Sequence, residues 1–109
     1  MTPPPETPRP KRTPLKLVTI IAEAVLEDRL VRDLRSLGAR GWTTSHVRGE
    51  GSRGTRTSGL EGGNVRIETL VVPEVADRIL DHLAEHYFAH FALVAFAETV
   101  EVVRGDKYA

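Results

Sequence analysis

The sequence predicts one α+β domain with the element order β-α-β-β-α-β. Two stretches carry apolar residues at helical spacing, and four others are rich in β-branched residues or alternate between apolar and polar residues. The chain has 109 residues, which suits a single domain with a modest hydrophobic core. Together these observations predict a four-stranded sheet with two helices.

The N-terminal segment differs from the rest in composition. Residues 2–14 hold six of the seven prolines and little apolar surface, so they favour extended conformations. We therefore expect a disordered tail over residues 1–14 and a folded domain over residues 15–109. Arg9, Lys11 and Arg12 make the later part of the tail basic, which leaves open a solvated tail or a docking segment for an acidic partner.

The first half of the domain contains two predicted strands around a helix. Residues 15–22 are short and rich in β-branched side chains, which favours a buried strand. Residues 26–38 place four leucines along one helical stripe, and Gly38 is suited to end that helix. Residues 41–48 predict the second strand.

The second half repeats this pattern. Residues 64–72 alternate between apolar or small side chains and charged ones, which predicts a strand with one buried face. Pro73 suits the first turn of the helix predicted over residues 73–88. Residues 91–105 predict a long final strand.

This order is the split βαβ, or ferredoxin-like, sandwich, in which two helices cover one face of an antiparallel sheet. Enough apolar residues remain for the uncovered face, including Ile21 and the first half of the last strand. We infer that the sheets of several subunits pack together there.

Composition excludes several functional classes. The 15 basic and 15 acidic residues cancel, so the chain as a whole has no attraction for nucleic acid. There is no cysteine, which excludes disulfides, thiol nucleophiles and zinc–thiolate sites. No apolar run approaches the roughly 20 residues that span a bilayer, and the N-terminus does not resemble a signal peptide. We expect a soluble, cytoplasmic protein without a nucleic-acid partner.

The connection over residues 49–63 is the strongest candidate for a ligand site. Hairpin connections usually need about two to five residues, whereas this one is much longer and holds six of the nine glycines. Glycine lets backbone N–H groups approach an anion, and Ser52 adds a hydroxyl. Arg53 and Arg56 supply planar guanidinium groups that suit phosphate or carboxylate. Composition alone leaves two interpretations open, a mobile solvated loop and an anion site.

Two patterns lie near the end of the second predicted helix. His82 and His86 fit the H-x-x-E-H spacing of some zinc proteases, but a third ligand and a cleft would be needed, so we expect solvent-facing histidines and no metal site. Three aromatic residues gather in residues 85–93. They favour either packing at the hinge between helix and strand or a wall for a flat ring.

The segment over residues 38–53 resembles PII signal-transduction proteins. Gly41, Thr43, Gly49 and Gly51 match that family's G-x-T-x₅-G-x-G pattern, and the resemblance extends over residues 15–105. The chain also departs from typical members. Its "HYFAHFAL" segment has no glycine or lysine where they have a phosphate-binding loop.

Two further departures concern ligands of typical PII proteins. Glu101 and Val103 stand where those proteins carry a pair of arginines for the ATP phosphates. Arg53 stands where they carry the loop glutamine on which their 2-oxoglutarate and magnesium site depends.

The chain is more similar to the PII-like branch associated with bicarbonate transport and carboxysomes, the SbtB and carboxysome-PII type. Residues 49–59 fit its G-x-G-S-R-x-x-R-x-S-G pattern, and Tyr87 and Phe88 match its aromatic pair. The cysteine pair at the C-terminus of some members is absent, which excludes a redox-controlled clasp there.

This resemblance implies a non-catalytic homotrimer that binds AMP or ADP, and also ATP less favourably, in clefts between subunits. No catalytic cofactor is implied. The residues expected to bind the nucleotide come from the second strand, the loop, the hinge and the last strand: Thr43, Ser45, Gly49, Gly51, Ser52, Arg53, Arg56, Phe88, Phe91, Phe96 and Glu98. Ser52, Arg53 and Arg56 are also the expected bicarbonate ligands.

The expected output is a signal through the long loop to a bicarbonate transporter or a carboxysome component, to which the protein would be recruited. Two alternatives stay open. One is a slow nucleotide hydrolase, for which Glu50 is the only acidic residue in the first half of the loop. The other is a structural trimer without a ligand.

Overall fold

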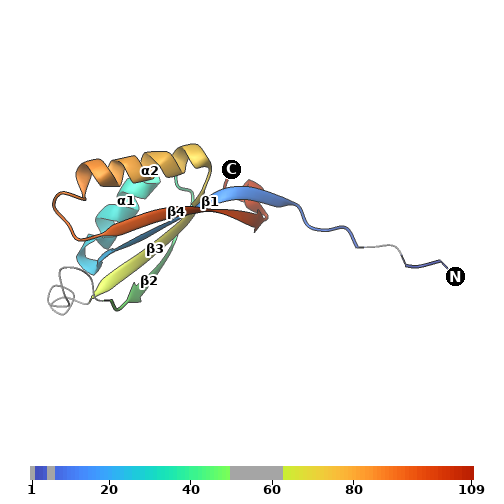
Figure 1. Cartoon of the computed structure of the whole chain (residues 1–109), viewed down its shortest axis with the longest axis horizontal. Coiled ribbons are helices and arrows are strands. Elements are labelled where there is room, and N and C mark those ends of the chain that lie inside the picture. The colour runs from blue at the N-terminus through green and yellow to red at the C-terminus, as the bar shows by residue number, and fades with distance from the viewer. Residues whose placement is uncertain (1, 5–6, 50–62) are drawn as a thin grey trace.

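The computed structural model describes residues 2–4, 7–49 and 63–109. Its elements are β1 (Arg12–Glu23), the short 3-10 helix η1 (Ala24–Leu26), α1 (Glu27–Leu37), β2 (Thr43–Val47), β3 (Asn64–Val71), α2 (Pro73–His86), β4 (Val94–Val103) and the 3-10 turn η2 (Gly105–Lys107). The predicted order of strands and helices is confirmed (Figure 1).

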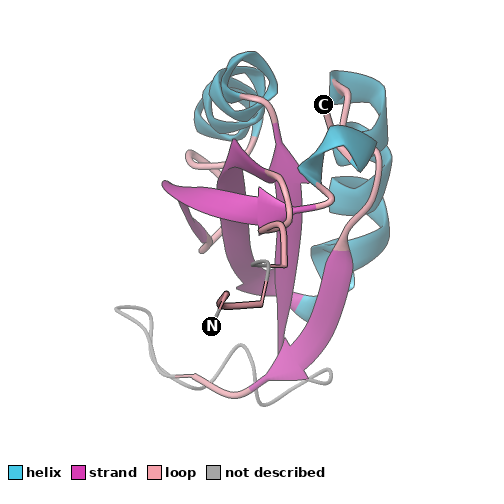
Figure 2. Cartoon of the chain, turned by 90° about the vertical axis from the view of Figure 1, so that its right-hand side faces the viewer, coloured by secondary structure: helices cyan, strands magenta, loops and turns pink. Residues whose placement is uncertain are grey.

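The four strands form one antiparallel sheet in the order β2-β3-β1-β4. Both helices pack on the same side of this sheet (Figure 2), so the fold is the predicted ferredoxin-like sandwich. Gly38 ends α1 with a φ of 116°, and Pro73 occupies the first turn of α2, as expected from the sequence.

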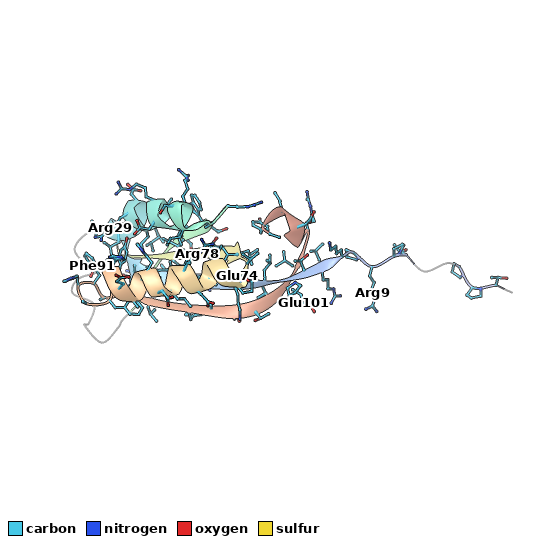
Figure 3. All side chains as sticks on the ribbon, turned by 90° about the horizontal axis from the view of Figure 1, so that it is seen from above. Arg9, Arg29, Glu74, Arg78, Phe91 and Glu101 are labelled. Carbon is cyan, nitrogen blue, oxygen red and sulfur yellow. The ribbon has the colours of Figure 1, made fainter. Side chains whose placement is uncertain are left out.

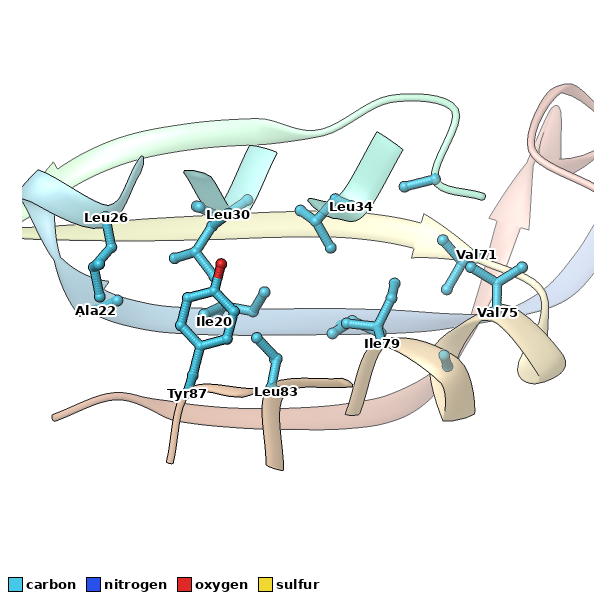
Figure 4. Packing of buried hydrophobic residues seen from close by; sticks show 14 of the residues in the cluster. Ile20, Ala22, Leu26, Leu30, Leu34, Val71, Val75, Ile79, Leu83 and Tyr87 are labelled. Atoms are coloured by element: carbon cyan, nitrogen blue, oxygen red, sulfur yellow. The ribbon is translucent and has the colours of Figure 1, made fainter. Parts of the chain in front are cut away.

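The hydrophobic core lies between the sheet and the helices. Ile20 of β1 and Ile67 of β3 are at most 1% exposed, and Leu30 of α1 and Ile79 of α2 are completely buried against them. Figure 4 shows side chains of this core converging from both layers. The apolar stripes that predicted the helices therefore face the sheet.

The first strand starts earlier than expected. Residues 12–14, which we assigned to the tail, pair with residues 101–103 of β4. Proline has no backbone N–H to donate to a neighbouring strand. Pro14 is accepted there because pairing between β1 and β3 begins only at Lys16, so this end of β1 has β4 as its single neighbour. Figure 1 shows this end of the strand extending away from the helices.

The face of the sheet opposite the helices, which we call the open face, stays largely uncovered. Phe96 and Val94 of β4 point to it and are 44% and 53% exposed. Thr19 is only 1% exposed on this face, and its hydroxyl has no hydrogen-bond partner among the described residues. In the part of the chain that the structure describes, no helix is long and apolar enough to cross a membrane.

Candidate ligand site at the start of β2

A cavity of about 340 Å³ lies where the chain enters β2, at the edge of the open face. Its lining comes from β1, the entry to β2, β3 and the C-terminus: Leu17, Gly41, Trp42, Thr43, Glu68, Thr69, Leu70 and Tyr108. Strand pairing brings these segments together, because Thr43 lies opposite Glu68 and Leu17 lies opposite Leu70.

Local contacts fix the wall formed by residues 41–43. The Thr69 hydroxyl donates a hydrogen bond to the Gly41 carbonyl over 2.6 Å, which holds the chain at the entry to β2. The guanidinium of Arg35, in the last turn of α1, lies 5.1 Å from the centre of the Trp42 ring. Helix α1 and strand β3 therefore both position this wall.

The cavity is lined about equally by apolar and polar surface. Leu17, Leu70 and the aromatic rings of Trp42 and Tyr108 supply apolar surface, whereas Glu68 supplies a carboxylate. The Arg66 guanidinium donates to that carboxylate over 3.3 Å. Two aromatic rings and two leucines beside one carboxylate suit a flat ring that carries a hydrogen-bond donor.

Among the described residues that were predicted to bind nucleotide, only Thr43 lines this cavity. Ser45 lies on the same face two residues further along β2, opposite Arg66. We did not predict Leu17, Glu68, Leu70 and Tyr108 as lining residues. The alternation in β3 could have placed Glu68 and Leu70 on the open face, but nothing in the sequence placed Tyr108 there.

The residues predicted from the last strand lie at the opposite edge of the sheet. A cross-strand row runs from Thr43 through Glu68 and Thr19 to Phe96, which puts three strand spacings of about 4.8 Å between its ends. Glu98 is exposed on β4, opposite Leu17. Within a single chain Phe96 therefore lies at the opposite edge of the sheet from Thr43, whereas Glu98 adjoins Leu17, which lines the cavity from β1.

The loop residues of the predicted site are only partly described. Gly49 follows β2 and lies beside Asn64, because a side-chain carbon on Gly49 would be 3.6 Å from the Asn64 Nδ2 atom. Gly51, Ser52, Arg53 and Arg56 lie outside the described residues. Their roles toward phosphate and bicarbonate stay predictions.

The aromatic residues after α2 divide between packing and exposure. Tyr87 is fully buried, and Phe91 packs on it with 5.8 Å between ring centres. The Arg29 guanidinium lies over both rings, at 4.5 and 5.5 Å from their centres; Figure 3 shows Arg29 and Phe91 at the same end of the helical layer. Phe88 is 47% exposed and is the aromatic residue of this set that is available to a ligand or to another subunit.

A polar contact between the helices holds this end together. The Tyr87 hydroxyl donates to the Asp33 carboxylate over 2.5 Å, and His82 Nε2 donates to the same oxygen over 3.0 Å. Burial and the Asp33 contact raise the pKa of Tyr87 to about 12. Burial alone would raise the pKa of Asp33, but the Tyr87 and His82 hydrogen bonds and nearby positive charge lower it below its usual value.

This contact corrects our expectation for the histidine pair. We expected both histidines to face solvent, whereas the side chain of His82 is only 26% exposed and is paired with Asp33. The ring of His86 lies 4.5 Å from that of His82 and stays half-exposed. Within residues 2–4, 7–49 and 63–109, no group of three or more His, Cys, Asp or Glu side chains is arranged to hold a metal ion.

Comparison with known proteins connects the sequence and the fold to one family. The sequence matches the family described as Nitrogen regulatory protein P-II over residues 15–107. A solved PII-like signaling protein from Thermus thermophilus is 52% identical, with a TM-score of 0.79, and the match covers 90% of this chain and 98% of that one.

A second similar protein was solved with ligands. CPII, a nitrogen regulatory PII-like protein from Thiomonas intermedia, is 25% identical in a structure bound to ADP, AMP and bicarbonate. That match has a TM-score of 0.82 and covers 92% of this chain and 98% of CPII. A further CPII structure, bound to ADP and bicarbonate, is also 25% identical with a TM-score of 0.82, over 93% of this chain and 100% of CPII. Because the family match spans most of the sequence, the resemblance expected from the glycine pattern is confirmed, and this chain belongs to the P-II family of nitrogen regulatory proteins.

Proposed function

We propose that this protein is a non-catalytic PII-like sensor that binds AMP or ADP in clefts between the subunits of a homotrimer. The observation that carries the proposal is the cavity at residues 41–43, which joins apolar and aromatic walls to the Glu68 carboxylate. The proposal is also supported by CPII, which was solved with ADP and AMP bound and is similar to this chain over nearly the whole length of both proteins.

The open face supports assembly. The helices cover one face of the sheet, while Val94 and Phe96 remain exposed on the other. Exposed apolar side chains grouped on one face of a small domain favour burial against another protein surface. A second chain packed there would place its own β4 against the first chain. Its Phe96 and Glu98 would then supply the last-strand residues that lie away from Thr43 within one chain.

The cavity is suited to an adenine base. A purine ring would lie between the apolar walls, and the exocyclic amino group of adenine would donate to the Glu68 carboxylate. Guanine presents a carbonyl oxygen at the corresponding ring position, and a carboxylate repels it because both groups accept hydrogen bonds. We therefore expect AMP to bind more tightly than GMP, and Glu68→Gln to reduce that preference.

AMP and ADP are favoured over ATP because the chain lacks cations that would bind a third phosphate. The segment "HYFAHFAL" has no lysine, and Glu101 lies on β4, where its carboxylate pairs with Arg12 at 3.1 Å. A third phosphate would gain little from these groups, so AMP and ADP compete well with ATP. In the proposed site, Arg53 and Arg56 from the loop neutralise the phosphates.

Bicarbonate is the proposed second ligand. Its planar carboxylate matches the geometry of a guanidinium group, and Arg53, Arg56 and the Ser52 hydroxyl are its expected partners. CPII was solved with bicarbonate together with adenine nucleotides. If the two ligands share these residues, bicarbonate changes the affinity for AMP or ADP, and by linkage each nucleotide changes the affinity for bicarbonate to the same extent.

We propose that the output passes through the loop over residues 49–63. A loop ordered by one ligand and released by another presents a different surface to a partner. The partner proposed from the resemblance is a bicarbonate transporter or a carboxysome component. Limited proteolysis at Arg53 and Arg56 tests the loop: cleavage that is equally fast with and without nucleotide would exclude a ligand-controlled loop.

Isothermal titration calorimetry with AMP, ADP and ATP, each with and without bicarbonate, tests the function. We expect binding of AMP and ADP that is at least as tight as that of ATP, and an affinity that shifts with bicarbonate. A protein that binds none of the three would be a structural trimer at most. Release of phosphate from bound nucleotide that Glu50→Gln abolishes would instead identify a hydrolase.

A further inference from the structure

We propose that the C-terminal segment, residues 104–109, is part of the nucleotide site and that the Tyr108 ring stacks on the bound base. This inference rests on the proposed binding of nucleotide at residues 41–43. It assigns a binding role to a segment that follows the last strand of the sheet.

The segment is anchored tightly against the first strand. Arg104 adopts a φ of 67°, which no other non-glycine residue in the described part of the chain does, and this turns the chain after β4. Gly105 is then buried against β1, where a side-chain carbon would lie 2.6 Å from the Thr13 Cβ atom. Only glycine fits at this contact without a shift of the backbone, so the path of the segment is defined by packing.

This anchor directs the last turn toward the cavity. The Tyr108 N–H donates to the Gly105 carbonyl over 2.9 Å, closing the 3-10 turn η2. The Tyr108 ring then contacts the wall formed by residues 41–43, because a side-chain carbon on Gly41 would lie 3.8 Å from the Tyr108 Cε1 atom. Figure 1 shows the C-terminus returning to the sheet beside β1 and β4.

The neighbours of Tyr108 give the ring a binding role. Tyr108 and Trp42 line the same cavity, with the leucine side chains of β1 and β3. The half-buried ring leaves part of its surface available to a ligand. Stacking on an aromatic ring adds affinity for every base, because every base has a π face. Tyr108 therefore strengthens binding of purine nucleotides in general, whereas Glu68 selects adenine.

The test is calorimetric titration of the full chain with AMP and with GMP, comparing wild type with Tyr108→Ala and Tyr108→Phe. Loss of the ring is expected to weaken both nucleotides by the same factor, about tenfold. Tyr108→Phe, which keeps the ring, is expected to stay within about twofold of wild type. Asp81→Asn, at an exposed position of α2 outside the cavity, is the control and is expected to leave both affinities unchanged.

Gly105→Ala tests the anchor separately. The added carbon pushes the segment away from Thr13, so AMP binding is expected to weaken nearly as much as in Tyr108→Ala, and the double variant is expected to lose little more. Trp42 is the only tryptophan, so faster quenching of its fluorescence by acrylamide in Gly105→Ala and Tyr108→Ala would report the opened wall.

The outcomes separate this inference from the proposed function. If wild type binds AMP and Tyr108→Ala binds it equally well, the C-terminal segment has no binding role, while the nucleotide site stands. Tighter binding by Tyr108→Ala would show that the ring occupies the place of the base, which also overturns the inference. A wild-type protein that binds no nucleotide would overturn both.

Discussion

The two faces of the sheet differ in how completely they are covered. On the helical side, Ile20, Ile67 and Ile79 are at most 1% exposed and pack into one continuous core. On the open face, Val94 and Phe96 are about half exposed. The sheet therefore stabilises the single chain through one face, and the other face is exposed and available for the association proposed above.

The same contrast separates folding residues from candidate binding residues. The helical side has few polar groups near its core, and those of Asp33, Tyr87 and His82 satisfy one another. The open face carries Glu68 at its cavity and the hydroxyl of Thr19, which has no partner among the described residues. Exposed apolar side chains and a buried hydroxyl without a partner are features expected of a surface that packs against another chain, as proposed above.

The largest expected effect is on assembly. Phe96→Glu places a charge on the open face of every subunit. We expect it to convert the proposed trimer to monomers, because a buried unpaired charge is strongly unfavourable. Val103→Glu is the matched control, because Val103 is similarly exposed on the same strand but its side chain points to the opposite face of the sheet. Sedimentation analysis that finds both variants with the mass of wild type would refute an interface on the open face.

The next effect is on stability through the covered face. Ile79→Ala removes a fully buried side chain, and we expect a loss of about 2–5 kcal/mol in the free energy of unfolding. Asp77→Ala, at an exposed position of the same helix, should change it by less than about 0.5 kcal/mol. Urea unfolding of both variants measures the difference, and equal losses would contradict the described core.

A smaller effect is expected from the contact between the helices at alkaline pH. The pKa of Tyr87 is about 12 in the folded chain and 10.0 when unperturbed. The unfolded state therefore loses its proton first, and stability falls as pH rises from about 10 to about 12. Tyr87→Phe should be less stable at neutral pH and should show a flatter decline over this window, as measured by urea unfolding at each pH. An unchanged decline would exclude Tyr87 as its source.

The smallest effect concerns Thr19. Thr19→Val removes a buried hydroxyl that has no partner among the described residues, so we expect it to be neutral or to stabilise the chain by up to about 1 kcal/mol. Urea unfolding at low concentration, where monomers prevail, measures this term. A loss of stability confined to the assembled protein would show that another subunit supplies the partner of the hydroxyl.

The sequence predicted the fold well because each element has its own local signal. Leucine spacing predicted α1, alternation predicted β3, and Pro73 and Gly38 indicated helix ends. The predicted start of the first strand was wrong. The prolines up to residue 14 suggested a tail, whereas pairing with β4 decides the conformation there.

The candidate site was less predictable because it depends on long-range contacts. Thr43, which lines the cavity, was predicted through the family resemblance that the glycine pattern around it carries. Leu17, Glu68 and Tyr108 join it only through strand pairing and the return of the C-terminus, and neither is encoded in local spacing. Phe91 was expected at a ligand, but its contacts with Tyr87 and Arg29 give it a packing role in the single chain.

Native mass spectrometry of the full chain with AMP tests the central claim most directly, because one spectrum reports both the assembly and the ligand. We predict a species of three times the 12.0 kDa chain mass that carries up to three AMP molecules. A monomer that binds AMP, or a trimer that binds none, would contradict the account of nucleotide sites completed by packing on the open face.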